Sequence, residues 1–171
     1  STYIARQAIL DRNSKTIGYE LLFRDSPENK FPEIDQDVVS SKLIIQNHLQ
    51  GDIQSISLGK LAFINFTEKC LINKYPLIFD KKSIVIELVG HCSPTERLIK
   101  IVKFYCEKGY RIALTEYDVD EKWDALFPYL SMIKVDVEKV NPKRLKPVVS
   151  RIKPFGIKLA AEKVETNFQL Q

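Results

Sequence analysis

Oxygen-bearing side chains recur at the ends of short apolar segments along this chain. Each segment has the length of a buried strand, and the carboxyl ends of the strands of a parallel α/β barrel open onto one common mouth. Carboxylate and amide oxygens gathered at that mouth are the ligands that Mg²⁺ or Mn²⁺ prefers. The strand-end oxygen donors are Glu20, Asn65, Glu87, Glu116, Asp136 and Glu162, and the cationic Lys134 lies at the same end of its strand.

Three of these residues form the core of a predicted cation site, namely Glu20, Asn65 and Glu87. A second cation would need further carboxylates, for which Glu116 and Asp136 are the candidates. Two cations about 4 Å apart activate a water molecule and stabilise the leaving oxygen of a phosphodiester. The alternative for each residue taken alone is that it only caps a strand end, and we favour the site for the ordered set.

Two positions modify this chemistry. Lys134 would offset charge on a bound phosphate or orient the attacking water. Thr115 stands beside Glu116 where a second acid is expected, and a neutral hydroxyl is a poor bridging ligand. Glu116 is one methylene longer than aspartate, so it would reach inward less rigidly. We therefore expect weak cation binding and a two-cation arrangement that is hard to assemble.

The histidines and cysteines offer weaker candidates. His91 and Cys92 lack partners at zinc-binding spacing, and His48 is expected to be a packing or surface residue. The cysteines are odd in number and fall in or beside apolar segments. We therefore expect Cys70, Cys92 and Cys106 to be free, buried thiols in a reducing compartment.

Composition narrows the class of protein. The chain has 171 residues, of which 44% are hydrophobic and 28% charged, and this is typical of one soluble globular domain. It contains no apolar run long enough to cross a membrane and no secretory leader, so we expect a cytoplasmic location. The net charge of +4 is scattered rather than gathered in a stripe, which argues against binding to duplex nucleic acid.

The first part of the chain predicts a β-hairpin. Apolar-rich runs from Tyr3 to Leu10 and from Lys15 to Arg24 flank a polar turn. A helix is then expected from about Asp37 to Leu49, ending at Gly51.

The remainder predicts strands alternating with helices, and hence a parallel sheet. Strands are expected near residues 61, 84, 111, 132 and 157. One helix is predicted after Ser93, which would form a capping box with Glu96 around Pro94, and to end at Gly109. Its expected buried stripe is Leu98, Ile101, Val102 and Tyr105.

A second helix is predicted to begin at Asn141 and Pro142 and to leave through Pro154 to Gly156. Its expected buried residues are Leu145, Val148, Val149 and Ile152. Seven strands result, whereas a closed (β/α) barrel has eight strands and roughly 250 residues. The pattern alone leaves open either a doubly wound sheet or a barrel that lacks its last strand-helix unit.

The order of these strand-end residues along the chain resembles that of the EAL domain family of bacterial cyclic di-GMP phosphodiesterases. The anchor is the run Gly-Tyr-Glu-Leu-Leu-Phe-Arg from Gly18 to Arg24, in which Leu21 replaces the signature alanine. The opening run from Tyr3 to Gln7 is most similar to the branch in which a degenerate EAL domain precedes an HDOD domain. The other matching segments are 5–9, Asn65, 86–88, 134–136 and 161–166.

This resemblance implies a modified TIM barrel whose opening strand runs antiparallel, and it implies roles for individual residues. Glu20, Asn65, Glu87 and Glu116 fall on or beside metal-ligand positions, Lys134 and Glu162 on catalytic positions, and Gln7 and Arg24 on dinucleotide-contacting positions.

Three departures from the family pattern indicate a degenerate site. Thr115 and Glu116 replace adjacent aspartates, and Gly90 stands where an acid braces the following loop. The terminal Gln-Gly segment of the family would lie beyond Gln171. Losses within one mechanism compound, because groups that act as a unit fail together.

We therefore expect residues 1–171 to form a single, C-terminally truncated EAL-like domain that is not an active enzyme. The expected role is bacterial signal transduction through other signalling proteins, with an HDOD domain in the longer chain and association between copies. No cofactor is expected, or Mg²⁺ or Mn²⁺ if any site survives. The alternatives are an active cyclic di-GMP phosphodiesterase and a sensor that binds cyclic di-GMP weakly without cleaving it.

Overall fold

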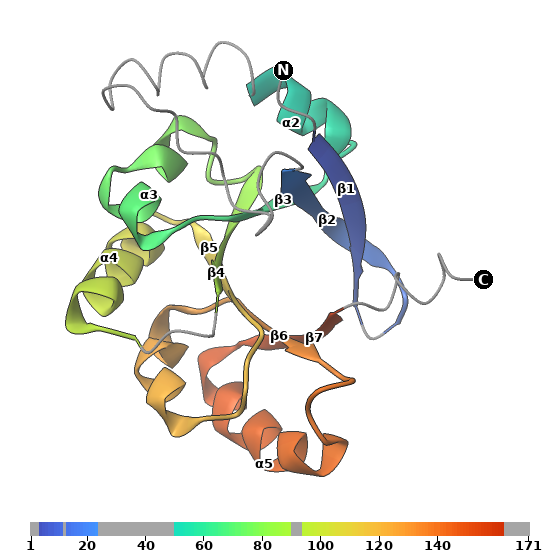
Figure 1. Ribbon diagram of the computed structural model, residues 1–171, viewed down its shortest axis with the longest axis vertical. Coiled ribbons are helices and arrows are strands. Elements are labelled where there is room, and N and C mark those ends of the chain that lie inside the picture. Colours follow the sequence, from blue (N-terminus) through green and yellow to red (C-terminus); the bar gives the residue numbers. More distant parts are fainter. Residues whose placement is uncertain (1–3, 12, 24–49, 90–93, 163–171) are drawn as a thin grey trace.

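Seven strands form one sheet whose spatial order follows the chain from β1 to β7 (Figure 1). The computed structural model describes residues 4–11, 13–23, 50–89 and 94–162. β1 (Ile4–Leu10) and β2 (Thr16–Phe23) pair antiparallel, as predicted, and each later neighbouring pair is parallel. The later strands are β3 (Leu61–Asn65), β4 (Ile84–Val89), β5 (Arg111–Thr115), β6 (Met132–Asp136) and β7 (Lys158–Glu162).

The sheet curls about a small interior core, which decides for a barrel-type fold over an open doubly wound sheet. Ile9 of β1 and Ala160 of β7 belong to the same buried cluster although their strands are the first and last of the sheet. The cluster is completed by Phe63, Val85, Ala113 and Met132, with Ile17 and Leu61 packed against it. The described strands therefore form an incomplete barrel, with β1 paired only to β2 and β7 only to β6.

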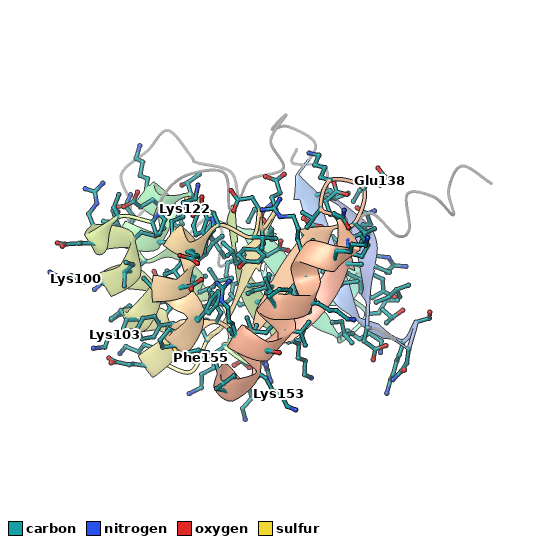
Figure 2. The ribbon with its side chains drawn as sticks, turned by 90° about the horizontal axis from the view of Figure 1, so that it is seen from below. Lys100, Lys103, Lys122, Glu138, Lys153 and Phe155 are labelled. Carbon is teal, nitrogen blue, oxygen red and sulfur yellow. The ribbon has the colours of Figure 1, made fainter. Side chains whose placement is uncertain are left out.

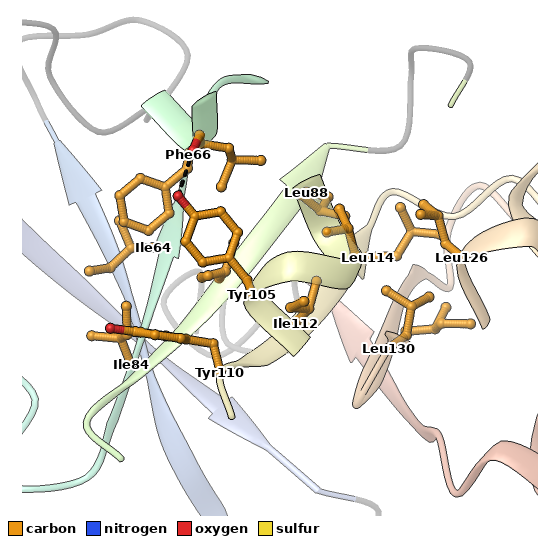
Figure 3. Packing of buried hydrophobic residues seen from close by; sticks show 14 of the residues in the cluster. Ile64, Phe66, Ile84, Leu88, Tyr105, Tyr110, Ile112, Leu114, Leu126 and Leu130 are labelled. Atoms are coloured by element: carbon orange, nitrogen blue, oxygen red, sulfur yellow. Dashed lines mark hydrogen bonds between the residues drawn. The ribbon is translucent and has the colours of Figure 1, made fainter. Parts of the chain in front are cut away.

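The opposite face of the sheet carries the larger core, against which the helices pack (Figure 3). Tyr105 and Tyr110 lie in this layer, and each phenol donates a hydrogen bond to a backbone carbonyl, of Leu71 at 2.5 Å and of Phe79 at 2.7 Å. These bonds satisfy the only polar atoms of the two side chains, so both rings can be buried at low cost. The covering elements are α3 (Glu68–Ile72), η1 (Tyr75–Ile78), α4 (Glu96–Glu107), η2 (Glu121–Tyr129) and α5 (Pro142–Ile152).

The helix α4 ends as predicted but begins differently. Gly109 adopts a φ of 95°, which only glycine adopts without strain, and its amide donates to Cys106. The N-terminal cap is Thr95, whose hydroxyl accepts from the Leu98 amide at 3.1 Å. The predicted capping box is therefore wrong, because Glu96 is already the first helical residue, and Ser93 lies outside the described residues.

The helix α5 begins at the predicted cap. The side chain of Asn141 accepts from the Lys143 amide at 2.9 Å, and Pro142 occupies the first turn. After α5 the chain passes through η3 (Lys153–Phe155) to Gly156, whose φ is 69°. Figure 2 shows Glu138 at one end of the barrel and Lys153 and Phe155 at the other, so α5 runs back along the outside. Val148 and Ile152 are buried, but the predicted burial of Val149 is wrong, since it lies 47% exposed beside the packed stripe.

The helix α2 (Gln50–Ile56) contradicts the predicted stop at Gly51. Its chain reversal comes later, where Gly59 has a φ of 73° and its amide donates to the Gln54 carbonyl. The helix expected from about Asp37 to Leu49 lies outside the described residues. Within the described ranges, none of the helices has the length and apolarity needed to span a bilayer.

The described cysteines are free thiols. Cys70 is buried and Cys106 half-buried, while Cys92 and both histidines lie outside the described residues. Trp123 and Phe127 are both buried in the larger core.

Candidate active site

The polar strand-end residues face the interior of the barrel because of the two-residue period of a strand. Side chains two positions apart point to the same side, and each polar residue follows an interior apolar residue by two positions. These pairs are Phe63 and Asn65, Val85 and Glu87, Ala113 and Thr115, and Met132 and Lys134. A polar layer therefore lies above the apolar one, at the carboxyl ends of the strands.

Lys134 lies at the centre of this layer. Its Nζ is 3.0 Å from Glu87 Oε2 and 3.4 Å from Glu20 Oε2, so one ammonium group bridges two carboxylates from β4 and β2. Lys134 and Glu87 are fully buried, whereas the side chain of Glu20 is 23% exposed. The ammonium also lies 5.8 Å from the ring centroid of Phe63, below it in the barrel. The structure thus brings together three residues that the sequence placed at separate strand ends.

Asn65 adds an oxygen acceptor beside this group. Its Cα is paired with that of Glu87 across β3 and β4, so the two side chains share a face of the sheet. Asn65 is 8% exposed, and its Oδ1 receives no hydrogen bond from the described part of the chain. A buried acceptor of this kind fits a cation or a water molecule as its partner. Together with Glu20 and Glu87, Asn65 therefore offers an oxygen set suited to one hard cation.

The position expected to supply a further acid is engaged otherwise. Thr115 is buried, and its hydroxyl donates to the carbonyl of Leu88 at 3.0 Å. Glu116 is exposed and has a left-handed backbone with a φ of 54°. Among the described residues, no three Asp, Glu, His or Cys side chains are grouped so as to hold a metal ion. At the position where the sequence analysis expected a second acid, the described structure has a hydroxyl that bonds to the backbone.

Asp136 has a structural role at the end of β6. Its Oδ1 accepts from the Glu138 amide at 3.0 Å, and its carbonyl accepts from Lys139 and Val140. These bonds form the turn that leads towards α5. Asp136 and Glu162 are Cα partners across β6 and β7, and the side chain of Glu162 lies outside the described part of the structure.

The two residues predicted to contact a dinucleotide differ in what the structure shows of them. Gln7 is half-buried, and its Cα is paired with that of Glu20 across β1 and β2, so it faces the same side. Arg24 and Gly90 lie outside the described residues.

Tyr117 is a neighbour of the site that the sequence analysis did not single out. Its amide donates to the Lys134 carbonyl at 3.3 Å, which joins the loop after β5 to the strand that carries the ammonium. Its ring is buried, and burial raises the pKa of Tyr117 although the nearby Arg151 opposes that rise. Its ring packs in the larger, outer core against Phe127, so the two-residue alternation of β5 did not point to it.

Comparisons with known proteins place this architecture. No protein-family model matches the sequence. Over 138 residues, or 80% of its length, the chain is 38% identical to the cyclic di-GMP phosphodiesterase CdgJ of Vibrio cholerae. The solved structure of the EAL enzyme Bd1971 with cAMP and cyclic di-GMP bound covers 99% of the chain with a TM-score of 0.63, at 16% identity. The chain has the EAL-domain fold.

A second solved structure with this fold is a manganese and cyclic di-GMP complex of Klebsiella pneumoniae BlrP1. It covers 94% of the EAL-like chain with a TM-score of 0.59, at 18% identity. The chain spans 32% of the length of CdgJ, 57% of Bd1971 and 48% of BlrP1. The predicted modified barrel with an antiparallel opening strand is confirmed.

Proposed function

We propose that this chain is a catalytically degenerate EAL-like domain that acts in bacterial cyclic di-GMP signalling through contacts with other proteins. The observation that carries the proposal is the hydrogen bond from Thr115 to the Leu88 carbonyl. A neutral hydroxyl that bonds to the backbone stands where a bridging carboxylate is needed. It carries no negative charge to offset that of two cations.

The remaining donors support at most one cation. Glu20, Asn65 and Glu87 would hold a Mg²⁺ or Mn²⁺ ion, which would polarise a phosphate oxygen when bound. Lys134 already neutralises one of the two carboxylate charges at 3.0 and 3.4 Å. Glu116 is exposed and has a left-handed backbone, whereas Glu87 and Asn65 are buried. We infer that hydrolysis, which needs a metal-activated water and a stabilised leaving oxygen, is not sustained.

The proposed partners are other signalling proteins, including an HDOD domain. The sequence resemblance of the opening segment to the degenerate branch supports this partner. We also propose that residues 1–171 act as a single domain in the cytoplasm, with association between copies.

The deciding experiment is a steady-state assay of cyclic di-GMP with purified protein and excess Mn²⁺. We expect no conversion to the linear dinucleotide above the rate of a Glu20→Gln control, because both lack a complete metal site. Steady turnover abolished by Glu20→Gln would refute the proposal. It would instead establish the main alternative, an active phosphodiesterase, which the convergence of Glu20, Glu87 and Lys134 and the similarity to CdgJ favour.

A non-hydrolysing cyclic di-GMP sensor is the other alternative, because Gln7 faces the same side of the sheet as Glu20. Calorimetry separates the two roles that remain in the absence of turnover. Heat of binding at micromolar cyclic di-GMP that is lost in Gln7→Ala would establish a sensor. No heat at high micromolar ligand would leave the interaction module.

A further inference from the structure

Lys134 is a charged group deep in the barrel whose placement depends on two carboxylates. Lys134 is 2% exposed, and its ammonium lies 3.0 Å from Glu87 Oε2 and 3.4 Å from Glu20 Oε2. A buried ammonium without such partners is strongly disfavoured. The same reasoning applies to Glu87, whose side chain is wholly buried. The buried charges therefore stabilise one another within the protein itself.

The oxygens that contact the ammonium belong to the residues best placed to bind a cation. Mg²⁺ needs carboxylate oxygens at about 2.0–2.1 Å. A cation at that distance from Glu87 Oε2 would lie within a few ångströms of the Lys134 ammonium. Two like charges so close together repel strongly at low dielectric. The ammonium and a divalent cation thus compete for the same oxygens.

The contacts around Lys134 limit the directions in which its side chain can move away from the carboxylates. β6 pairs with β7 at Lys134 and Ala160, and the Lys134 carbonyl accepts the amide of Tyr117 at 3.3 Å. The Phe63 ring lies 5.8 Å from the ammonium on the apolar side of the barrel. Movement of the side chain away from the carboxylates would therefore have to go towards the mouth.

We propose that Lys134 is a built-in counter-ion that sets the divalent-cation affinity of this site, holding it low by neutralising Glu20 and Glu87 in the metal-free protein. The proposal rests on the proposed function in one respect, namely that these carboxylates form the cation site. Lys134 weakens cation binding and keeps the protein stable without metal. Thr115 removes a ligand, whereas Lys134 competes for the ligands that remain.

The test is calorimetric titration of Mn²⁺ alone, with no nucleotide, into the wild type and into Lys134→Met and Lys134→Gln. We expect each folded variant to bind Mn²⁺ about tenfold more tightly than the wild type or better, because a full positive charge has left the buried site. We also expect each variant to melt lower than the wild type without metal and to regain stability when Mn²⁺ is added. Lys139→Met, which removes the same charge from an exposed position, should leave Mn²⁺ affinity unchanged.

The tighter Mn²⁺ binding of the Lys134 variants must also depend on the carboxylates. Adding Glu87→Gln to Lys134→Met should abolish the tighter binding. Affinity no higher than that of the wild type in both Lys134 variants, or failure of both to fold even with excess Mn²⁺, overturns the proposal. Turnover of cyclic di-GMP by the wild type would refute the proposed function but leave this result unaffected, since Mn²⁺ binding is measured without substrate.

Discussion

The hydroxyl of Thr115 donates a hydrogen bond of 3.0 Å to the carbonyl of Leu88, and this bond joins the carboxyl ends of β5 and β4 beside the buried Glu87. The bond gives the buried hydroxyl of Thr115 a hydrogen-bond partner. Position 115 therefore has a neutral side chain that bonds to the backbone and supplies no negative charge to the site. In the neighbouring site, Lys134 contacts the carboxylates of Glu20 and Glu87, and Asn65 lies beside Glu87 on the adjacent strand.

Replacing Thr115 by aspartate should change how stability depends on metal. We expect Thr115→Asp to lower the metal-free free energy of unfolding by about 2–4 kcal/mol, because a carboxylate is buried near Glu87 and the bond to Leu88 is lost. Excess Mn²⁺ should recover much of this loss. Thermal denaturation with and without Mn²⁺ measures both effects, and Thr115→Val should show the loss of the bond, about 1 kcal/mol, without the recovery. Equal melting shifts on metal addition in Thr115→Asp and Thr115→Val would contradict this account.

The two carboxylates that contact Lys134 should differ in their contribution to stability. Glu87 is fully buried at 3.0 Å, whereas the Glu20 side chain is 23% exposed at 3.4 Å. We expect Glu87→Gln to cost about 3 kcal/mol, since it leaves a buried ammonium poorly paired, and Glu20→Gln to cost about 1 kcal/mol. Urea denaturation gives both values. Equal costs, or the reverse order, would show that the ammonium does not depend mainly on Glu87.

Gly18 should not accept a larger side chain because β2 and β3 approach closely there. A Cβ at this position would lie 2.5 Å from the Leu61 carbonyl oxygen and 2.8 Å from a ring carbon of Phe63. We expect Gly18→Ala to destabilise the protein by about 3 kcal/mol through this overpacking. The matched control is Gly59→Ala, which meets nothing within 4 Å and costs only the strain of its φ of 73°, about 1 kcal/mol. If chemical denaturation shows that the two variants are equally stable, the close approach of β2 and β3 at Gly18 is not what limits the side chain there.

The buried tyrosines should make the protein lose stability in alkali. Burial raises the pKa of Tyr105 and of Tyr110, with neighbouring charges adding to the rise. Both phenols are neutral in the folded and unfolded states below the ordinary pKa of about 10, so their contribution to stability is fully present there. Above it the unfolded chain ionises first, and stability falls as pH rises towards the folded-state pKa.

Urea midpoints measured between about pH 8 and pH 11 test this pH dependence. Tyr105→Phe should be less stable overall, because it loses the hydrogen bond to Leu71, but its midpoint should fall less steeply in alkali. A slope identical to that of the wild type would mean that Tyr105 ionises as readily in the folded protein as in the unfolded one.

Much of the fold followed from local sequence patterns. Polar turn residues between two apolar runs predicted the opening hairpin, and its turn is closed by Asp11, whose side chain accepts amides of Asn13 and Lys15. Helix ends were less predictable, since several polar residues near each end could form the cap. The cap was predicted at Ser93, whereas Thr95 caps α4 in the structure. The stop predicted at Gly51 is likewise wrong, because Gly51 lies within α2 and the chain reverses at Gly59.

By itself the sequence determined the strands, their two-residue alternation and the types of side chain at their ends, because these depend on local backbone geometry and on burial of apolar groups. The tertiary structure alone decided which polar groups meet. Lys134 and Glu20 lie 114 residues apart in the chain, and their contact depends on strand register and on the curvature of the whole sheet. The bond between Thr115 and Leu88 likewise depends on how β4 and β5 are aligned, which no single segment specifies.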